Sequence, residues 1–145
     1  RGGEDGVADR RRDGWVAQLA HAAGAEVVVD KRVRRLGVGT ALYAARRDLA
    51  VRLGLWRIRA HSRLAGYARH AGEMSAEDYV RKVLAGELRD PTLSFQLRHG
   101  FRVLGIVADY LDHDGAHSMG HAALIECINE EGVPAEVLAN RREWT

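Results

Sequence analysis

Cysteine, proline and long apolar runs are scarce in this sequence, and each scarcity excludes a class of protein. One of the 145 residues is cysteine and two are proline. Because Cys127 has no second cysteine to pair with, an intrachain disulfide is excluded, and we expect a cytoplasmic setting. No apolar run approaches the roughly 20 residues that a membrane-spanning helix needs, and the charged first residues do not resemble a signal peptide. We therefore expect no membrane association.

Lysine is almost absent as well. Lys31 and Lys82 are the only lysines among 22 basic residues, and the net charge is +2 with a pI near 9.0. The dominance of arginine indicates a compositional bias. A surface for single-stranded nucleic acid would need a basic block with interleaved aromatic residues, and the sequence has none. We expect no nucleic-acid partner.

The remaining composition is that of an ordinary globular domain, with 46% hydrophobic and 29% charged residues. The charged, glycine-rich first residues predict a flexible segment over residues 1–25 that includes one short helix. Residues 26–130 are expected to form the folded domain, and residues 131–145 a tail with weak periodicity. The sequence shows no internal repeat.

Hydrophobic periodicity predicts the order of the elements. A valine run predicts a buried strand over residues 26–30, and alternation predicts a second strand over residues 55–61. Between them lies a helix that ends at Gly54. One face of this helix is continuously apolar through Val38, Leu42, Ala45, Leu49 and Leu53. A strand, a helix and a strand within about 35 residues imply neighbouring parallel strands.

Two more helices and two more strands are predicted in the second half of the chain. Ser75 and Asp78 form a capping-box pattern at the start of one helix. Asp90 before Pro91 marks the start of another, which we expect to run to His99. Residues 101–111 and 118–128 are the last strand candidates, separated by a polar turn. The predicted class is α+β, with α/β-like features.

The stretch between the first strand and its helix, Arg34–Thr40, has the composition of an anion-binding turn. A helix start offers backbone N–H groups, and glycine lets a ligand approach the backbone closely. The P-loop requires lysine and then Ser or Thr directly after its second glycine, whereas Thr40 and Ala41 follow Gly39. The dinucleotide-binding pattern requires a third glycine where Leu42 stands. The pattern Arg/Gln-x-x-Gly-x-Gly/Ala fits without a mismatch at Arg34, Gly37 and Gly39.

This segment resembles the pyrophosphate-binding motif of the GNAT superfamily, the acyl-CoA-dependent N-acetyltransferases. Residues 90–101, "DPTLSFQLRHGF", resemble a later helix of that superfamily and its Gly-Phe entry to the next strand. Residues 66–103 and 108–126 are most similar to GNAT domains that occur with carbon–nitrogen hydrolases of the nitrilase type. The resemblance covers residues 26–130 and implies a GNAT-type mixed central sheet flanked by helices.

The resemblance implies acetyl-CoA as co-substrate and an amine, on a small molecule or a peptide, as acceptor. It implies that Arg34 flanks the pyrophosphate as a charged donor, and that an N–H near Val29 polarises the thioester carbonyl. The cofactor-binding residues that it implies are Val27, Val28, Val29, Arg34, Arg35, Leu36, Gly37, Val38, Gly39 and Thr40.

Two features depart from the superfamily's pattern. Only about 25 residues precede the motif strand, where the superfamily usually places several strands and two helices. The fold is therefore expected to be shortened, or completed by a partner chain. An open edge at residues 26–30 would be covered by dimerisation or strand exchange. The second departure is Gln96, which stands where many members carry a tyrosine that protonates the CoA thiolate; glutamine cannot transfer a proton near neutral pH.

A base that deprotonates the amine is also required. The candidates are Glu26 on the motif strand, and Tyr110 or Asp109 near the end of the penultimate strand; we select Glu26 and Tyr110. If no base is present, the alternative is a degenerate GNAT module that binds CoA or a partner chain without turnover.

Two other groups of residues suggest chemistry that we do not favour. His113, His117 and His121 would align on a helix as a zinc face, but Gly115 and Gly120 break that helix, so we expect a turn and no metal. Cys127 with a lysine and a glutamate would suit a nitrilase triad. The chain is too short for that fold, and a buried core cysteine is the better interpretation.

Overall fold

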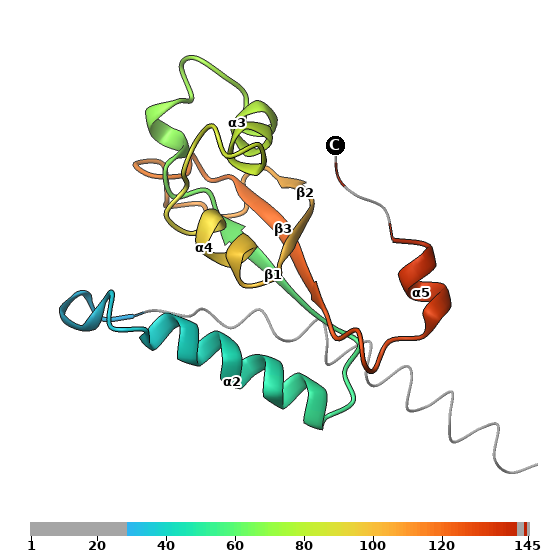
Figure 1. Ribbon diagram of the computed structural model, residues 1–145. Helices are drawn as coiled ribbons and strands as arrows, with labels where there is room; N and C mark the ends of the chain where they lie inside the picture. The colour runs from blue at the N-terminus through green and yellow to red at the C-terminus, as the bar shows by residue number, and fades with distance from the viewer. Residues whose placement is uncertain (1–28, 142–143, 145) are drawn as a thin grey trace, which may run out of the picture. The chain divides into compact units, whose positions relative to one another are not determined.

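A computed structural model describes residues 29–141 and 144 of the chain. Along these residues helices and strands follow one another as drawn in Figure 1. They are η1 (Lys31–Val33), α2 (Val38–Arg52), β1 (Arg57–Arg63), η2 (Tyr67–Arg69), α3 (Ala76–Leu84), α4 (Leu93–Arg98), β2 (Arg102–Val107), β3 (Ala122–Ile128) and α5 (Ala135–Ala139). The helix expected within residues 14–24 lies outside the described residues.

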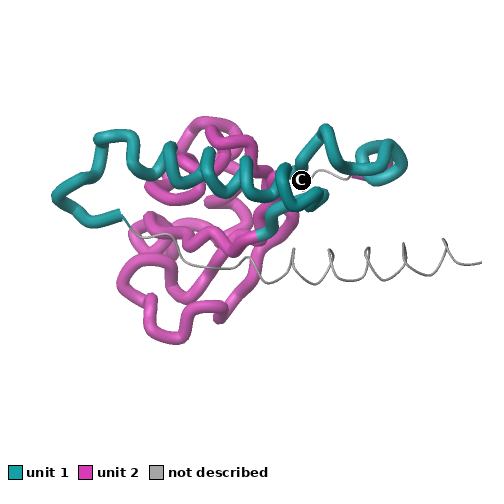
Figure 2. The backbone as a smooth tube through the Cα atoms, turned by 90° about the horizontal axis from the view of Figure 1, so that it is seen from below, with its two compact units in different colours: residues 1–59, 128–139 teal, residues 60–127, 140–145 magenta. Residues whose placement is uncertain are grey.

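The chain divides into two compact units, which Figure 2 distinguishes by colour. The first unit comprises Arg1–Arg59 and Ile128–Ala139, and the second comprises Ala60–Cys127 and Asn140–Thr145. Strands β1 and β3 therefore each cross from one unit into the other. We describe the units separately.

In the first unit, α2 forms as expected and ends where Gly54 adopts a left-handed φ of 64°. Four alanines among its 15 residues favour helix formation, whichever face of the helix is buried. The end of the helix is joined to β1 by the Leu55 N–H, which donates to the Ala50 carbonyl at 2.9 Å. Asn129 then fixes the start of β1, because its side chain donates to the Leu55 carbonyl and its N–H to the Trp56 carbonyl.

The predicted apolar face of α2 is not the buried face. Val38, Leu42, Leu49 and Leu53 are 37%, 40%, 49% and 58% exposed. The more covered residues lie on a different side of the helix and are Gly39, Tyr43, Arg46 and Ala50, of which Ala50 alone is fully buried. Small alanines around the whole circumference let the helix turn a second face inward, so the leucine spacing did not decide its orientation.

The predicted strand over residues 26–30 is not confirmed in its described part. Val29 and Asp30 have no regular structure, and Asp30 instead caps η1 by accepting a hydrogen bond from the Arg32 N–H at 2.8 Å. Residues 26–28 lie outside the described residues. The parallel pairing inferred from the strand–helix–strand order is therefore absent from the described sheet.

The described sheet has three strands in the order β1-β3-β2 (Figure 1). Strands β2 and β3 are antiparallel, with Val103 opposite Ile125 and Val107 opposite Ala122, and an irregularity between Val103 and Gly105. The Leu64 N–H donates to the His121 carbonyl, and the Asn129 N–H to the Trp56 carbonyl. These two bonds pair the ends of β1 and β3 in opposite directions, so the sheet is antiparallel and the fold class is α+β.

The core of the second unit lies between this sheet and the helices α3 and α4. Its largest fully buried side chains are Tyr79, Leu64, Leu93, Ile125, Glu126, Val80, Asp90, Ser62 and Ser118. Cys127 is 6% exposed, which confirms the expected core cysteine. Ser75 caps α3 as predicted, since its hydroxyl accepts from the Asp78 N–H at 3.1 Å.

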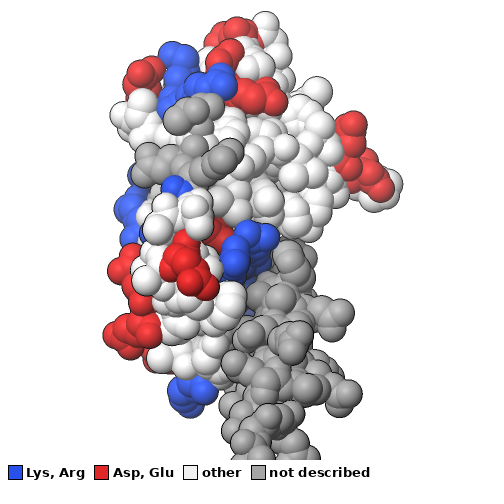
Figure 3. Space-filling view, turned by 90° about the vertical axis from the view of Figure 1, so that its right-hand side faces the viewer, with Lys and Arg blue, Asp and Glu red and all other residues white. Residues whose placement is uncertain are grey.

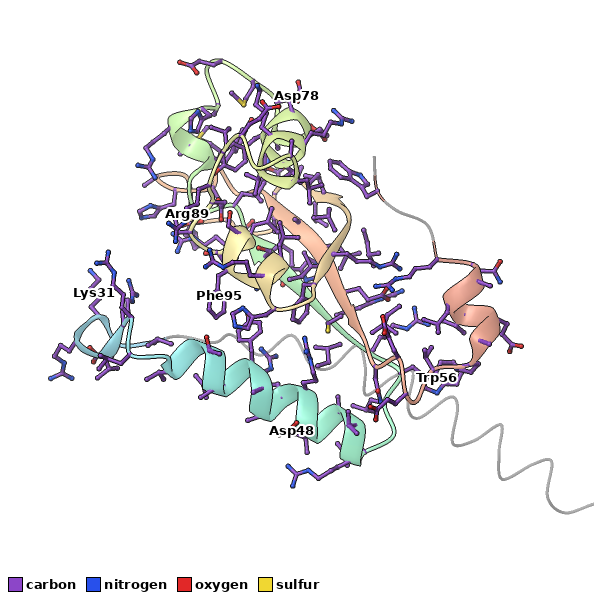
Figure 4. All side chains as sticks on the ribbon, in the orientation of Figure 1. Lys31, Asp48, Trp56, Asp78, Arg89 and Phe95 are labelled. Atoms are coloured by element: carbon purple, nitrogen blue, oxygen red, sulfur yellow. The ribbon has the colours of Figure 1, made fainter. Side chains whose placement is uncertain are left out.

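Asp90 ties three segments of the second unit together. The Thr92 and Leu93 N–H groups donate to one carboxylate oxygen at 2.9 and 2.8 Å. The Gly66 N–H and the Tyr79 hydroxyl donate to the other at 2.9 and 3.0 Å. The Asp90 carboxylate thus caps the turn at Pro91 and Thr92 that leads into α4, which runs from Leu93 to Arg98 within the expected range. Phe95 on α4 holds its ring 4.2 Å from that of His99 (Figure 4).

Candidate functional site

The segment before α2 is an exposed turn built on few side-chain contacts. Lys31, in η1, extends away from the ribbon (Figure 4). Arg32 forms an ion pair with Asp30 at 2.8 Å, and this hydrogen bond lowers the pKa of the Asp30 carboxyl group. The Arg34 side chain donates from Nε to the Val29 carbonyl at 3.0 Å. Arg34 is thereby held across the base of the turn, with its guanidinium group at the surface.

Two left-handed residues shape this turn. Arg35 has a φ of 67° and Gly37 a φ of 81°. Gly37 is the N-cap of α2, and no side chain caps the helix there. Backbone N–H groups beside left-handed residues and at a helix start form concave anion-binding sites. A left-handed conformation costs a residue such as arginine about 1–2 kcal/mol, and such strain concentrates at functional sites.

The two glycines of the motif have different roles. Gly37 is required by its backbone, because its φ of 81° is one that side-chain-bearing residues rarely adopt. A Cβ added at Gly37 would meet nothing within 4 Å, so close packing does not require it. Gly39 lies inside α2 and is not among the residues with positive φ. Glycine in a helix costs roughly 1 kcal/mol relative to alanine. The backbone gives no reason for Gly39.

The other residues predicted to bind the cofactor fall into two groups. Leu36, Val38 and Thr40 lie on the same turn and first helical residues, and Leu36 is 72% exposed. Val29 precedes η1, and its carbonyl is occupied by Arg34. The predicted residues Val27 and Val28, and the predicted base Glu26, lie outside the described residues.

In the second unit, the predicted catalytic residue Tyr110 lies against a histidine that the sequence analysis did not select. The rings of His61 and Tyr110 stack with centroids 4.0 Å apart and planes inclined by 19°. Both side chains are partly accessible, and Tyr110 is 44% exposed. Burial lowers the pKa of the His61 imidazole below its ordinary value. The alternation of β1 places His61 on the same face as Arg59 and Arg63, which was the available signal.

The loop that carries Tyr110 is fixed by backbone and carboxylate bonds. The Tyr110 and Leu111 N–H groups both donate to the Gly120 carbonyl, at 2.9 and 3.2 Å. Arg63 holds Asp114 through two hydrogen bonds of 2.6 and 2.5 Å, and the Ser118 hydroxyl donates to the same carboxylate at 2.5 Å. The Arg63 hydrogen bonds, more than the Ser118 bond, lower the pKa of Asp114.

The remaining candidates are placed as follows. Gln96 on α4 is buried at 6% exposure, and Asp109 is an exposed residue in a left-handed conformation, with a φ of 52°. His113 and His117 lie in the turns between β2 and β3, and His121 directly precedes β3, so no helix aligns the three. Within the described residues, no three or more His, Cys, Asp or Glu side chains gather in a way that could hold a metal ion.

Surface charge and helix length add two observations. The face drawn in Figure 3 carries acidic and basic groups in small neighbouring clusters, without a field of one sign. Among residues 29–141, no helix is both long and apolar enough to cross a membrane.

Two curated proteins are similar to this chain in sequence. The chain is 42% identical over 113 residues to the probable hydrolase YhcX of Bacillus subtilis (strain 168), a match that covers 78% of this chain and 22% of that protein. It is 34% identical over 104 residues to the uncharacterized N-acetyltransferase YkwB of the same organism, covering 72% and 45%. No family model matches the chain.

A solved structure is also similar to this chain. The GphF GNAT-like decarboxylase in complex with isobutyryl-CoA superimposes with a TM-score of 0.61 at 32% identity, over 69% of this chain and 51% of that one. Together, the fold and these matches define an α+β domain of the GNAT type. The chain belongs to the GNAT superfamily. It spans about half or less of the length of each of these relatives.

Proposed function

We propose that the turn Arg34–Thr40 binds the pyrophosphate of an acyl-CoA, and that the chain serves acyl transfer from this CoA to an amine. The observation that carries the proposal is Gly39. Its helical backbone gains nothing from glycine, and we propose that a ligand approaching the first turn of α2 uses the space of the missing side chain. The isobutyryl-CoA bound by the GphF decarboxylase supports a CoA-type ligand.

The neighbouring residues suit the same ligand. The left-handed backbone of Arg35 and Gly37 turns the chain into α2, whose first N–H groups and positive dipole end favour an anion. Arg34 adds a surface guanidinium group that can form charged hydrogen bonds with phosphate oxygens. Acetyl is the acyl group that we propose, in keeping with the N-acetyltransferase YkwB.

The proposed reaction is direct attack of a neutral amine on the thioester carbonyl. A C–N bond forms, the C–S bond breaks, CoA leaves as a thiolate, and the amine nitrogen gives up one proton to a base or to water. Glutamine has no proton to transfer near neutral pH, so the buried Gln96 does not protonate this thiolate, which instead takes a proton from water. The acceptor is a small-molecule or peptide amine.

Decarboxylation of an acyl-CoA is the second candidate, because the GphF structure is that of a GNAT-like decarboxylase. The two reactions differ in their products: acyl transfer releases free CoA thiol, whereas decarboxylation releases carbon dioxide and leaves the thioester intact. A module that binds CoA without turnover gives neither product.

We further propose that this GNAT domain works beside a second protein or domain. The match to YhcX, a probable hydrolase, covers only 22% of that protein, which supports a carbon–nitrogen hydrolase as partner. A homodimer is the other arrangement that we propose to test. Both would be detected by the mass of the purified protein in solution.

The test of the function is a titration with acetyl-CoA followed by product analysis. A ligand at 100 times its dissociation constant stabilises the folded state by about 2.7 kcal/mol, so the melting temperature should rise. Thiol release is then measured with a panel of amines, and carbon dioxide release with acyl-CoAs that carry a carboxylate β to the thioester carbon. An unchanged melting temperature at millimolar CoA contradicts the ligand, and carbon dioxide without amine-dependent thiol favours decarboxylation.

A further inference from the structure

A stripe of apolar side chains on α2 faces solvent in the first unit. Its members share one side of the helix and are Val38, Leu42, Ala45, Leu49 and Leu53. The exposed fraction of the four larger side chains runs from 37% at Val38 to 58% at Leu53. The buried side of α2 is a different one and carries Ala50. Apolar side chains gathered in this way on a surface mark interaction sites.

The segment that carries the stripe is basic. Residues 30–53 contain seven lysines or arginines and two aspartates, and one of these, Asp30, is engaged by Arg32. Arg47 and Arg52 are exposed on α2, and Arg52 directly precedes the end of the stripe. Two α2 helices side by side would bring like charges together, which opposes association. The stripe is complementary to an apolar surface that is bordered by carboxylates.

A segment of the opposite charge occurs in the same unit. Residues 129–140 contain three glutamates and no lysine or arginine. Two of these glutamates, Glu131 and Glu136, are exposed, and α5 has no buried residue. The larger apolar residues of the segment are all partly accessible and are Val133, Val137 and Leu138. The segment is thus both acidic and apolar at its surface.

Within one copy of the chain, these two segments do not cover each other. Both belong to the first unit, yet the stripe on α2 stays exposed and α5 buries none of its residues. Asn129 holds the start of the acidic segment, because its carbonyl accepts the Gly132 and Val133 N–H groups at 3.2 and 3.1 Å. A second copy can offer its acidic segment to the stripe without any rearrangement of this turn.

We propose that the apolar stripe of α2 binds residues 129–140 of a second copy of this chain, and that the two copies do so reciprocally. A two-fold axis makes this contact occur twice in one dimer. Burial of apolar surface drives the association, and the opposite charges determine which surfaces meet. The proposal names the surface of the homodimer proposed above. It uses residues of the first unit alone and does not require that the turn bind CoA.

The first test measures the mass of the full chain by sedimentation over a range of protein concentrations, where we expect a monomer–dimer equilibrium. Leu49→Glu puts a carboxylate into both contacts and should raise the dimer Kd about tenfold or more, because an unpaired charge opposes burial. The matched control is Ala44→Glu, the same change of charge at an exposed residue of α2 outside the stripe. It should keep the dimer Kd within about threefold. Circular dichroism checks that both variants keep the wild-type helix content.

An exchange of charges tests which segment lies on α2. One variant carries Arg47→Glu and Arg52→Glu, and the other carries Glu131→Lys and Glu136→Lys. Each variant alone should dimerise more weakly than the wild type at low salt, because like charges then meet in both contacts. Mixed in equal amounts, the two variants should form a heterodimer, because each reversed surface meets its reversed partner.

Each failure has a distinct meaning. A wild type that stays monomeric at every concentration overturns the inference, and sedimentation of that monomer with vesicles of phosphatidylcholine and phosphatidylserine assigns the stripe to a lipid surface instead. A dimer that Leu49→Glu does not weaken overturns this surface and leaves the homodimer standing. Charge-reversed variants that do not associate when mixed overturn residues 129–140 as the occupant. A failure to bind CoA, measured separately by titration, overturns the proposed function and leaves this inference standing.

Discussion

The turn before α2 and the carboxylate-anchored loops of the second unit both contain left-handed backbone, but they hold it in different ways. In the loop after β2, Asp109, Met119 and Gly120 have positive φ, and the surrounding N–H groups and side chains bond to Asp114 and to the Gly120 carbonyl. In the turn, Arg35 and Gly37 have positive φ while no side chain caps the helix that follows.

This difference is what we expect if the loop is a scaffold and the turn is the ligand site that we propose. A carboxylate that satisfies several donors stabilises the loop around it, because each donor would otherwise lack a protein partner. A helix start without a side-chain cap leaves its donors to be satisfied by water or by a ligand. We therefore expect substitutions in the loops to lower stability, and substitutions in the turn to lower affinity for CoA.

The largest loss of stability is expected at Asp90. Its carboxylate is fully buried and accepts four hydrogen bonds. Burial and the nearby Asp90 charge raise the pKa of the Tyr79 hydroxyl, so this hydroxyl keeps its proton and remains a donor at physiological pH. Asp90→Asn turns an NH₂ group towards two of these donors and should cost about 3 kcal/mol. Thermal unfolding should show a loss of about 10 °C.

Asp78→Asn is the matched control for Asp90. Asp78 forms an exposed ion pair with Arg81 at 3.0 Å, and such surface pairs contribute about 0–1 kcal/mol. Its melting temperature should stay within about 3 °C of the wild type. Equal losses in the two variants would show that the buried carboxylate does not organise the second unit.

The largest loss of affinity is expected at Gly39. Gly39→Val places a branched side chain where we propose that the pyrophosphate approaches, so CoA affinity should fall about 100-fold or more, equivalent to about 2.8 kcal/mol. The helix itself should tolerate valine, since glycine is the poorer helix former. Isothermal titration with CoA measures the affinity, and thermal unfolding measures the stability.

Gly37 provides a control within the same turn, because its substitution should lower stability where that of Gly39 should lower CoA affinity. Gly37→Ala forces a side chain into a φ of 81° and should cost about 1–2 kcal/mol of stability, although nothing within 4 Å obstructs the new Cβ.

A Gly39→Val protein that binds CoA normally would remove the main support for the proposed ligand.

Local features of this fold could be predicted from the sequence, and long-range ones could not. The Ser75 cap and the end of α2 at Gly54 depend on neighbouring residues and were predicted correctly. The inward face of α2 was predicted wrongly, because its alanines allow more than one face to pack. His61 and Tyr110 meet because the β2–β3 loop folds onto β1, and no local pattern encodes that contact.

The smallest effect that we predict is a change in how stability depends on pH. The hydrogen bonds from Arg63 lower the pKa of the Asp114 carboxyl group below its ordinary value, so the folded state favours the ionised carboxylate. The stabilisation is complete above the ordinary aspartate pKa and is lost as the pH falls through the lowered folded value. Asp114→Asn should be less stable than the wild type by about 1 kcal/mol at pH 7, because the Arg63 side chain is 43% exposed and solvent screens the pair. The difference should shrink as the pH falls through the lowered pKa of folded Asp114. Denaturant unfolding of both proteins between pH 7 and pH 2.5 measures it, and a difference that stays constant over this range would show that the ion pair does not hold the loop.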